Sequence, residues 1–247
     1  MKMRNFDIES RAEGHPLRRF IYKNPLSKFL TTHLSIGDIL SEAFYGVWMA
    51  SVSTGLIFGF SDPNSSEALL YMVIIAISVN ATWGLIDGWT SVYGPKVNEA
   101  DDDRILRRLW HDPSDAKARE WIDDDIATGI GRNLDGPRRQ MVMGTYLESE
   151  PQVPENKEYR ADRNDFLSLL SLVIVEVLMA GLIVFPFILF PGEVYALMLS
   201  RAIAIIISGA IAYWFARRLN RRHPIIWVLI FALLMFVVMT LSWAFGW

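Results

Sequence analysis

Five stretches of the chain are long and apolar enough to cross a lipid bilayer as helices. They lie at about 36–60, 67–93, 166–190, 194–216 and 225–246. A spanning helix needs about 20 mostly apolar residues and satisfies its backbone hydrogen bonds internally. Only 21% of the residues are charged and 52% are hydrophobic. The sequence therefore predicts an all-α integral membrane protein with five transmembrane helices, and the lipid bilayer as its first partner.

The connections and the basic residues predict the topology. The short connections 61–66 and 191–193 are rich in turn-forming residues, so antiparallel hairpins are expected on both sides of them. Lys and Arg resist translocation, and they gather in residues 1–34, in the central loop and in residues 217–222. Five spans place these three regions on one side. We expect the N-terminus in the cytoplasm and the C-terminus outside.

Residues 94–165 form the only sizeable hydrophilic region and predict a small cytoplasmic helical domain. Asn98 is expected to begin its first helix and residues 113–115 its second, whereas residues 129–163 resemble an extended linker. The chain thus divides into a basic cytoplasmic or interfacial segment, two spans, the helical domain with its linker, and three spans, at 1–34, 35–93, 94–165 and 166–247.

Several functional classes lack the residues they need. The chain has no cysteine, which excludes disulfides and thiolate metal sites. No nucleophile–base set, Gly-rich phosphate loop or HExxH motif is present, and the 4 histidines all lie outside the apolar stretches or at their boundaries. The basic residues mark topology. We therefore expect neither enzymatic activity nor a nucleic-acid partner.

Acidic residues inside the first two spans are the strongest functional signal. An ionisable group at the bilayer centre costs about 2.5–3.5 kcal/mol, so such groups normally face a protein interior or an aqueous path. In antiparallel helices Glu42 and Asp87 share a depth, and Asp38 lies one turn from Glu42. Met49 and Asn80 share a level nearer the membrane centre. These five residues predict a path for a divalent cation, with Glu42, Asp87 and Met49 as metal ligands.

Structural explanations compete for each of these residues. Ser35 and Asp38 fit a capping box at the start of a helix. In the structural alternative Glu42 and Asp87 form hydrogen bonds that only hold the fold. Met49 would be a packing residue, and Asn80 would form hydrogen bonds between helices.

A second set of charged residues predicts an ion pair. Glu176 in the third span and Arg201 in the fourth would neutralise each other inside the membrane. This structural pairing is favoured over a catalytic role.

Acidic residues of the central domain are candidates for gathering cations, although a solvated helix face explains them as well. These candidate metal ligands are Glu99, Asp102, Asp103, Glu120, Asp123 and Asp124.

Four segments resemble the vacuolar iron transporter family, especially its divergent prokaryotic members: Leu40 to Gly46, Asn80 to Gly88, Phe185 to Phe187 and Ser200 to Ala210. The order of two spans, a helical domain and three spans is similar too. The resemblance implies a homodimer in a prokaryotic inner or plasma membrane, whose first two helices line a shared path. It further implies that Fe²⁺ or Mn²⁺ leaves the cytosol as a substrate in exchange for protons, without a resident cofactor.

Two positions depart from the family pattern. Met49 stands where the family has an aspartate in its first helix, and Trp83 where it has a methionine in its second. The expected function is a proton-coupled transporter of divalent metal. The alternative is a membrane scaffold or regulatory protein that keeps the fold without transport, and these two departures favour it.

Overall fold

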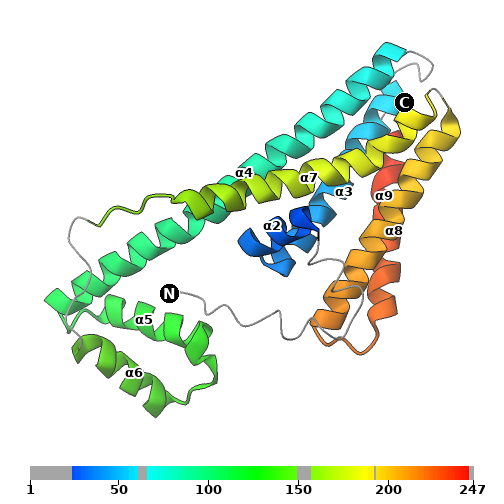
Figure 1. Ribbon diagram of the computed structural model, residues 1–247. Coiled ribbons are helices and arrows are strands. Elements are labelled where there is room, and N and C mark those ends of the chain that lie inside the picture. Colours follow the sequence, from blue (N-terminus) through cyan, green and yellow to red (C-terminus); the bar gives the residue numbers. More distant parts are fainter. Residues whose placement is uncertain (1–23, 61–65, 149–156, 192, 245–247) are drawn as a thin grey trace. The chain divides into compact units, whose positions relative to one another are not determined.

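The computed structural model describes residues 24–60, 66–148, 157–191 and 193–244, and in these residues the secondary structure is entirely helical (Figure 1). Its elements are α2 (Pro25–His33), α3 (Ile36–Phe60), α4 (Ser66–His111), α5 (Ala116–Thr128), the 3₁₀ helix η1 (Ile130–Asn133), α6 (Gly136–Glu148), α7 (Arg163–Leu189), α8 (Val194–Arg218) and α9 (Pro224–Ala244). They form two compact units. Unit 1 holds the described residues up to Thr90 and from Arg163 onward, and unit 2 is Ser91–Asp162.

Four of these helices are long and apolar enough to cross a membrane. They contain the segments Glu67–His111, Arg163–Leu189, Val194–Arg218 and Pro224–Ser242. This agrees with four of the five predicted spans and makes a membrane protein the plausible class. The remaining predicted span, at 36–60, corresponds to α3 and is not among these four helices. It has 25 residues, but acidic, hydroxyl and glycine residues lower the hydropathy of its sequence.

Three apolar clusters hold unit 1 together along its length. At one end Leu30 of α2 and Val175 of α7 pack with residues of α3 and α8. The middle cluster joins α3, α7, α8 and α9, with Ala180 and Met235 fully buried. At the other end Phe187 packs with the end of α3, the start of α4 and the start of α8. Both sides of each short connection meet there, which is the arrangement that the predicted hairpins require.

The start of α3 is fixed by its own side chains. The Ser35 backbone N–H donates to Asp38 Oδ2 at 3.0 Å, and the Asp38 N–H donates to Ser35 Oγ at 3.1 Å. This reciprocal pair is the predicted capping box. Asp38 is exposed there.

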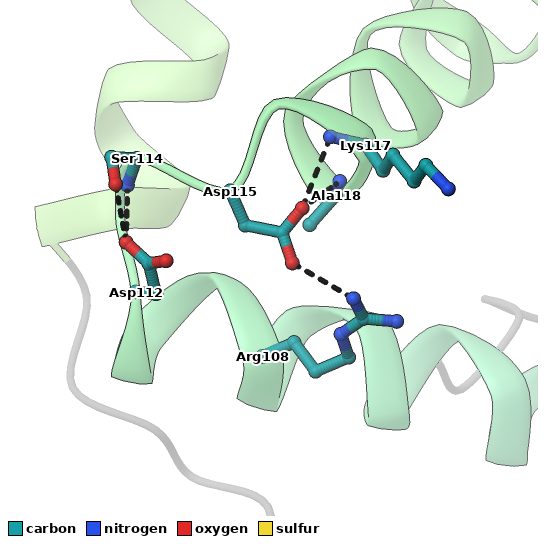
Figure 2. A network of polar contacts seen from close by, with 6 residues as sticks. All are labelled: Arg108, Asp112, Ser114, Asp115, Lys117 and Ala118. Carbon is teal, nitrogen blue, oxygen red and sulfur yellow. Dashed lines mark hydrogen bonds and ion pairs between the residues drawn. The ribbon is translucent and has the colours of Figure 1, made fainter.

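Unit 2 is a small helical domain around Leu109, Ile122 and Ile126. Leu109 of α4 packs against α5 in this cluster, and Val142 and Met143 of α6 add to it. Figure 2 shows the turn that joins α4 to α5. There Asp115 Oδ1 accepts hydrogen bonds from the backbone N–H groups of Lys117 and Ala118. Its Oδ2 forms an ion pair with Arg108 at 3.0 Å.

Two predictions for this region are wrong. The helix that contains Asp87 does not end near residue 93, because α4 continues as one helix through Pro95 and Asn98 to His111. Part of the predicted linker is also helical, since Gly136–Glu148 forms α6. The Arg138 N–H donates to Asp135 Oδ1 at the start of α6. Residues 149–156, which belong to the same predicted linker, lie outside the described residues.

Candidate functional site

Three carboxylates from three helices of unit 1 meet inside the bundle. They belong to Glu42 of α3, Asp87 of α4 and Glu176 of α7, and one oxygen from each lies within 4.8 Å of the others. The side chain of Glu176 is fully buried and that of Glu42 is 7% exposed, whereas Asp87 is half-buried. We call these three residues the acidic cluster. Among the described residues it is the one group of three or more His, Asp or Glu side chains arranged to hold a metal ion.

The acidic cluster lacks compensating donors. Both carboxylate oxygens of Glu176 and Oε2 of Glu42 are buried without a hydrogen-bond partner. A buried charge is costly unless it is paired, and like charges this close repel strongly where water is scarce. No ion pair from a described Lys or Arg reaches the three side chains. The arrangement therefore calls for protons or a cation between the carboxylates.

Glycines of α3 and α4 allow α7 to pack closely enough that Glu176 reaches Glu42 and Asp87. A Cβ on Gly46 of α3 would lie 2.8 Å from Glu176 Oε2, and one on Gly84 of α4 would lie 2.7 Å from the Cα of Val173. One turn further along α4, a Cβ on Gly88 would lie 2.6 Å from Leu169 Cγ. Contacts this short are essentially never observed for real Cβ atoms. The glycines of both helices thus make room for α7 beside Glu42 and Asp87.

The predicted path residues separate into two groups. Glu42 and Asp87 meet as predicted. Asp38 instead caps α3 at the surface, so the structural alternative holds for it. Asn80 is fully buried, its Nδ2 donates to the Ala76 carbonyl at 2.8 Å, and its Oδ1 has no partner. It precedes Asp87 by seven residues, and the half-buried Met49 follows Glu42 by seven. Each lies about 10.5 Å along its helix from the carboxylate-bearing residue.

The predicted Glu176–Arg201 ion pair is not formed. Both oxygens of Glu176 lack a hydrogen-bond partner, and an Arg201 guanidinium nitrogen donates to the Met239 carbonyl at 3.3 Å. In the structure Ser168 Oγ donates to the His33 carbonyl, which sets α7 level with the end of α2. From that level Glu176 lies eight residues along α7 and Glu42 lies nine residues beyond His33, so the two carboxylates face each other.

Three of the six predicted cation-gathering residues of unit 2 pair with basic side chains. Lys157 Nζ lies 2.7 Å from both Glu99 Oε1 and Asp103 Oδ2, and Tyr159 donates to the same Asp103 oxygen. Arg139 lies 4.0 Å from Asp123. Glu120, Asp102 and Asp124 join no cluster of three metal ligands in the described residues. A cavity of about 550 Å³ beside them is lined by acids and arginines together, including Asp102 and Arg104. The predicted cation-gathering ligand set is therefore not assembled.

Fold and site together define an all-helical protein with four helices long and apolar enough for a membrane and a largely buried carboxylate cluster between α3, α4 and α7. Comparison of the sequence with models of protein families and with curated proteins gives no match.

Proposed function

We propose that the protein is a proton-coupled transporter that moves a divalent metal, Fe²⁺ or Mn²⁺, out of the cytosol. The observation that carries this proposal is the acidic cluster, with buried carboxylate oxygens that have no hydrogen-bond donor. Carboxylate oxygens suit hard and borderline divalent cations. A metal ion and protons would occupy the same oxygens alternately, so binding of one releases the other.

The accessible side of the acidic cluster supports exchange. Asp87 is half-buried, whereas Glu42 and Glu176 are buried, so an ion would reach Asp87 first. Asn80 lies on α4 like Asp87, seven residues nearer to the start of that helix. Its buried Oδ1 has no hydrogen-bond partner. In this proposal it is the next oxygen on the path after the acidic cluster.

The proposed topology has five spans, with α3 as the first. The 25 residues of α3 suffice to span, and its Glu42 faces α7 and not the surface. Lys28, Arg163 and the arginines between α8 and α9 belong to the same end of unit 1, which the positive-inside rule assigns to the cytoplasm. In this proposal unit 2 lies in the cytoplasm, the C-terminus lies outside, and the protein is a homodimer related to the vacuolar iron transporters.

The transport proposal is tested with purified protein in liposomes that contain a dye sensitive to Mn²⁺ or Fe²⁺. Wild-type protein should admit metal at a rate that depends on an imposed proton gradient. Glu176→Gln should lower that rate at least about tenfold, because it removes one charge and one proton site with little change of shape. Glu193→Gln is the matched control, since Glu193 is exposed at the start of α8 and makes no side-chain cap. Equal flux in both variants would contradict the proposal.

A scaffold or regulatory protein is the second candidate. It is favoured by Lys157, which forms ion pairs with Glu99 and Asp103. A domain that gathers metal ions would need these carboxylates to be free. It is also favoured by Met49, which stands where the resembled family has an aspartate and lies seven residues from Glu42, about 10.5 Å along α3. Absence of metal flux with and without a proton gradient, in liposomes that contain folded protein, would decide for this candidate.

A further inference from the structure

Four exposed arginines crowd the turn between α8 and α9. They are Arg217, Arg218, Arg221 and Arg222. None of them forms an ion pair with a carboxylate in the part of the chain that the structure describes. So dense a group of exposed cations at the end of a helical hairpin is suited to bind an anion.

The turn holds these arginines in a fixed geometry. The Arg221 N–H donates to the Ala216 carbonyl at 2.9 Å, and the Asn220 N–H donates to the Arg217 carbonyl at 3.2 Å. Asn220 has φ of 52°. These features form a Schellman motif, in which asparagine is tolerated at the left-handed position. Pro224 then begins α9 at once, so the turn is short and well defined.

Two of the arginines lie over tryptophan rings. The Arg218 guanidinium carbon is 4.5 Å from the ring centroid of Trp214, and that of Arg221 is 5.5 Å from the ring centroid of Trp227. Stacking against an aromatic face orients the planar guanidinium and leaves its N–H groups free to bind an anion. Tryptophan is also enriched where hydrocarbon meets headgroups.

An apolar cavity of about 260 Å³ adjoins the same residues. Its lining includes Phe44 and Tyr45 of α3, Phe215 of α8, Leu219 just after α8, and Trp227 and Phe231 of α9. Trp227 belongs both to the cavity and to the arginine group, because it lines the cavity and its ring lies under the Arg221 guanidinium. An apolar cavity and a cationic rim therefore share one wall.

We infer that this is a binding site for an anionic phospholipid, with part of one acyl chain in the aromatic cavity and the phosphate on Arg218 and Arg221. The acyl chain gains little free energy by moving from the bilayer to an apolar protein surface, because both surroundings are apolar. Selectivity therefore comes from the net negative charge of the headgroup, because a zwitterionic headgroup brings its own cation beside the arginines. The inference depends on these helices being in a membrane and not on metal transport.

Native mass spectrometry of the full chain in mild detergent tests the site. The probe is an equimolar mixture of phosphatidylglycerol and phosphatidylcholine with identical acyl chains. One phosphatidylglycerol should be retained with a preference of about tenfold or more, as two arginines near an anionic headgroup provide. Arg218→Gln combined with Arg221→Gln should reduce this preference to near parity. Arg138→Gln with Arg160→Gln makes the same change of net charge in unit 2, where both arginines are exposed, and should leave the preference unchanged.

A competition experiment separates the lipid from a free phosphate. Lysophosphatidylglycerol, with one acyl chain, should displace the bound lipid, whereas glycerol phosphate at the same concentration should not. Three results would overturn the inference: equal retention of both lipids by the wild type, a preference that survives in the double variant of Arg218 and Arg221, or displacement by glycerol phosphate alone.

Discussion

The acidic cluster depends on residues without side chains as much as on its carboxylates. Gly84 is the most constrained of them, because a Cβ there would meet the backbone of Val173, which cannot turn aside. A Cβ on Gly46 would meet Glu176 Oε2, which can move, but also the Cβ of Met179 at 2.9 Å, so this glycine limits the approach of α3 to α7. At the residue scale, the separation of α4 and α7 is therefore set by Gly84.

Gly84→Ala should destabilise the protein, because α4 must move away from α7 by several tenths of an ångström or more. Overpacking of this kind costs about 1–3 kcal/mol. The midpoint of thermal unfolding in detergent, followed by tryptophan fluorescence, should fall. Gly181→Ala is the matched control, since Gly181 is also helical and has nothing within 4 Å of a Cβ. A fall of the same size in the control would show that helical glycine as such, and not the contact with Val173, causes the effect.

A bound metal should stabilise the wild type, because only the folded state brings the three carboxylates together. At a free Mn²⁺ concentration of 100 times Kd the expected gain is about 2.7 kcal/mol. Glu176→Gln should unfold at the same or a higher temperature than wild type without metal, since it removes an unpaired buried acid. It should gain little when Mn²⁺ is added. Equal stabilisation of both proteins would place the metal elsewhere.

At the scale of elements, an ionic contact fastens the end of unit 2 to α4. Lys157 bridges Glu99 and Asp103, and Tyr159 donates to Asp103 at 2.6 Å. Burial works against the Asp103 carboxylate, but the hydrogen bonds from Lys157 and Tyr159 outweigh it and hold the pKa of Asp103 below its ordinary value. Hydrogen bonds to Asp103 and Glu99 raise the pKa of Lys157.

The contact should persist at neutral pH and weaken in acid. Asp103 has a lower pKa when folded than when unfolded, so its stabilisation is present above the ordinary carboxylate range and is lost as pH falls through the folded pKa. The raised pKa of Lys157 means that its own contribution is lost only at strongly alkaline pH. Hydrogen exchange of residues 157–162 should accelerate as pH falls, after correction for the intrinsic pH dependence of exchange.

Lys157→Met should accelerate exchange in these residues at pH 7 and flatten its dependence on pH between neutral and acid. Lys117→Met is the control, because Lys117 is exposed on α5 and forms no ion pair with a described residue. Unchanged exchange in Lys157→Met would mean that packing, and not this contact, holds the segment.

The elements also show which features of the fold could be predicted from the sequence. Long apolar stretches and the Ser35–Asp38 capping box are local signals, and the structure agrees with them. The continuity of α4 through Pro95 could not be predicted, because proline and a change in polarity normally indicate a helix end. The partner of Glu176 could not be predicted either, because its level in the bundle depends on where α7 meets α2, which is a tertiary contact.

At the scale of the whole molecule, the two units have different polarity. Unit 1 contains the apolar helices and the acidic cluster, and unit 2 carries most of the ion pairs of the described residues. The helix α4 contributes residues to both. In the proposed topology, unit 1 carries out ion exchange in the membrane and unit 2 remains in water.

Proton release on metal binding tests the central claim most directly. Mn²⁺ is added to purified protein in weakly buffered solution with a pH indicator, and the protons released per protein are counted. Wild-type protein and Glu193→Gln should release protons, whereas Glu42→Gln and Glu176→Gln should release far fewer, because the metal displaces protons from the acidic cluster. Metal binding without proton release in the wild type, or release that these two substitutions leave unchanged, would contradict this exchange.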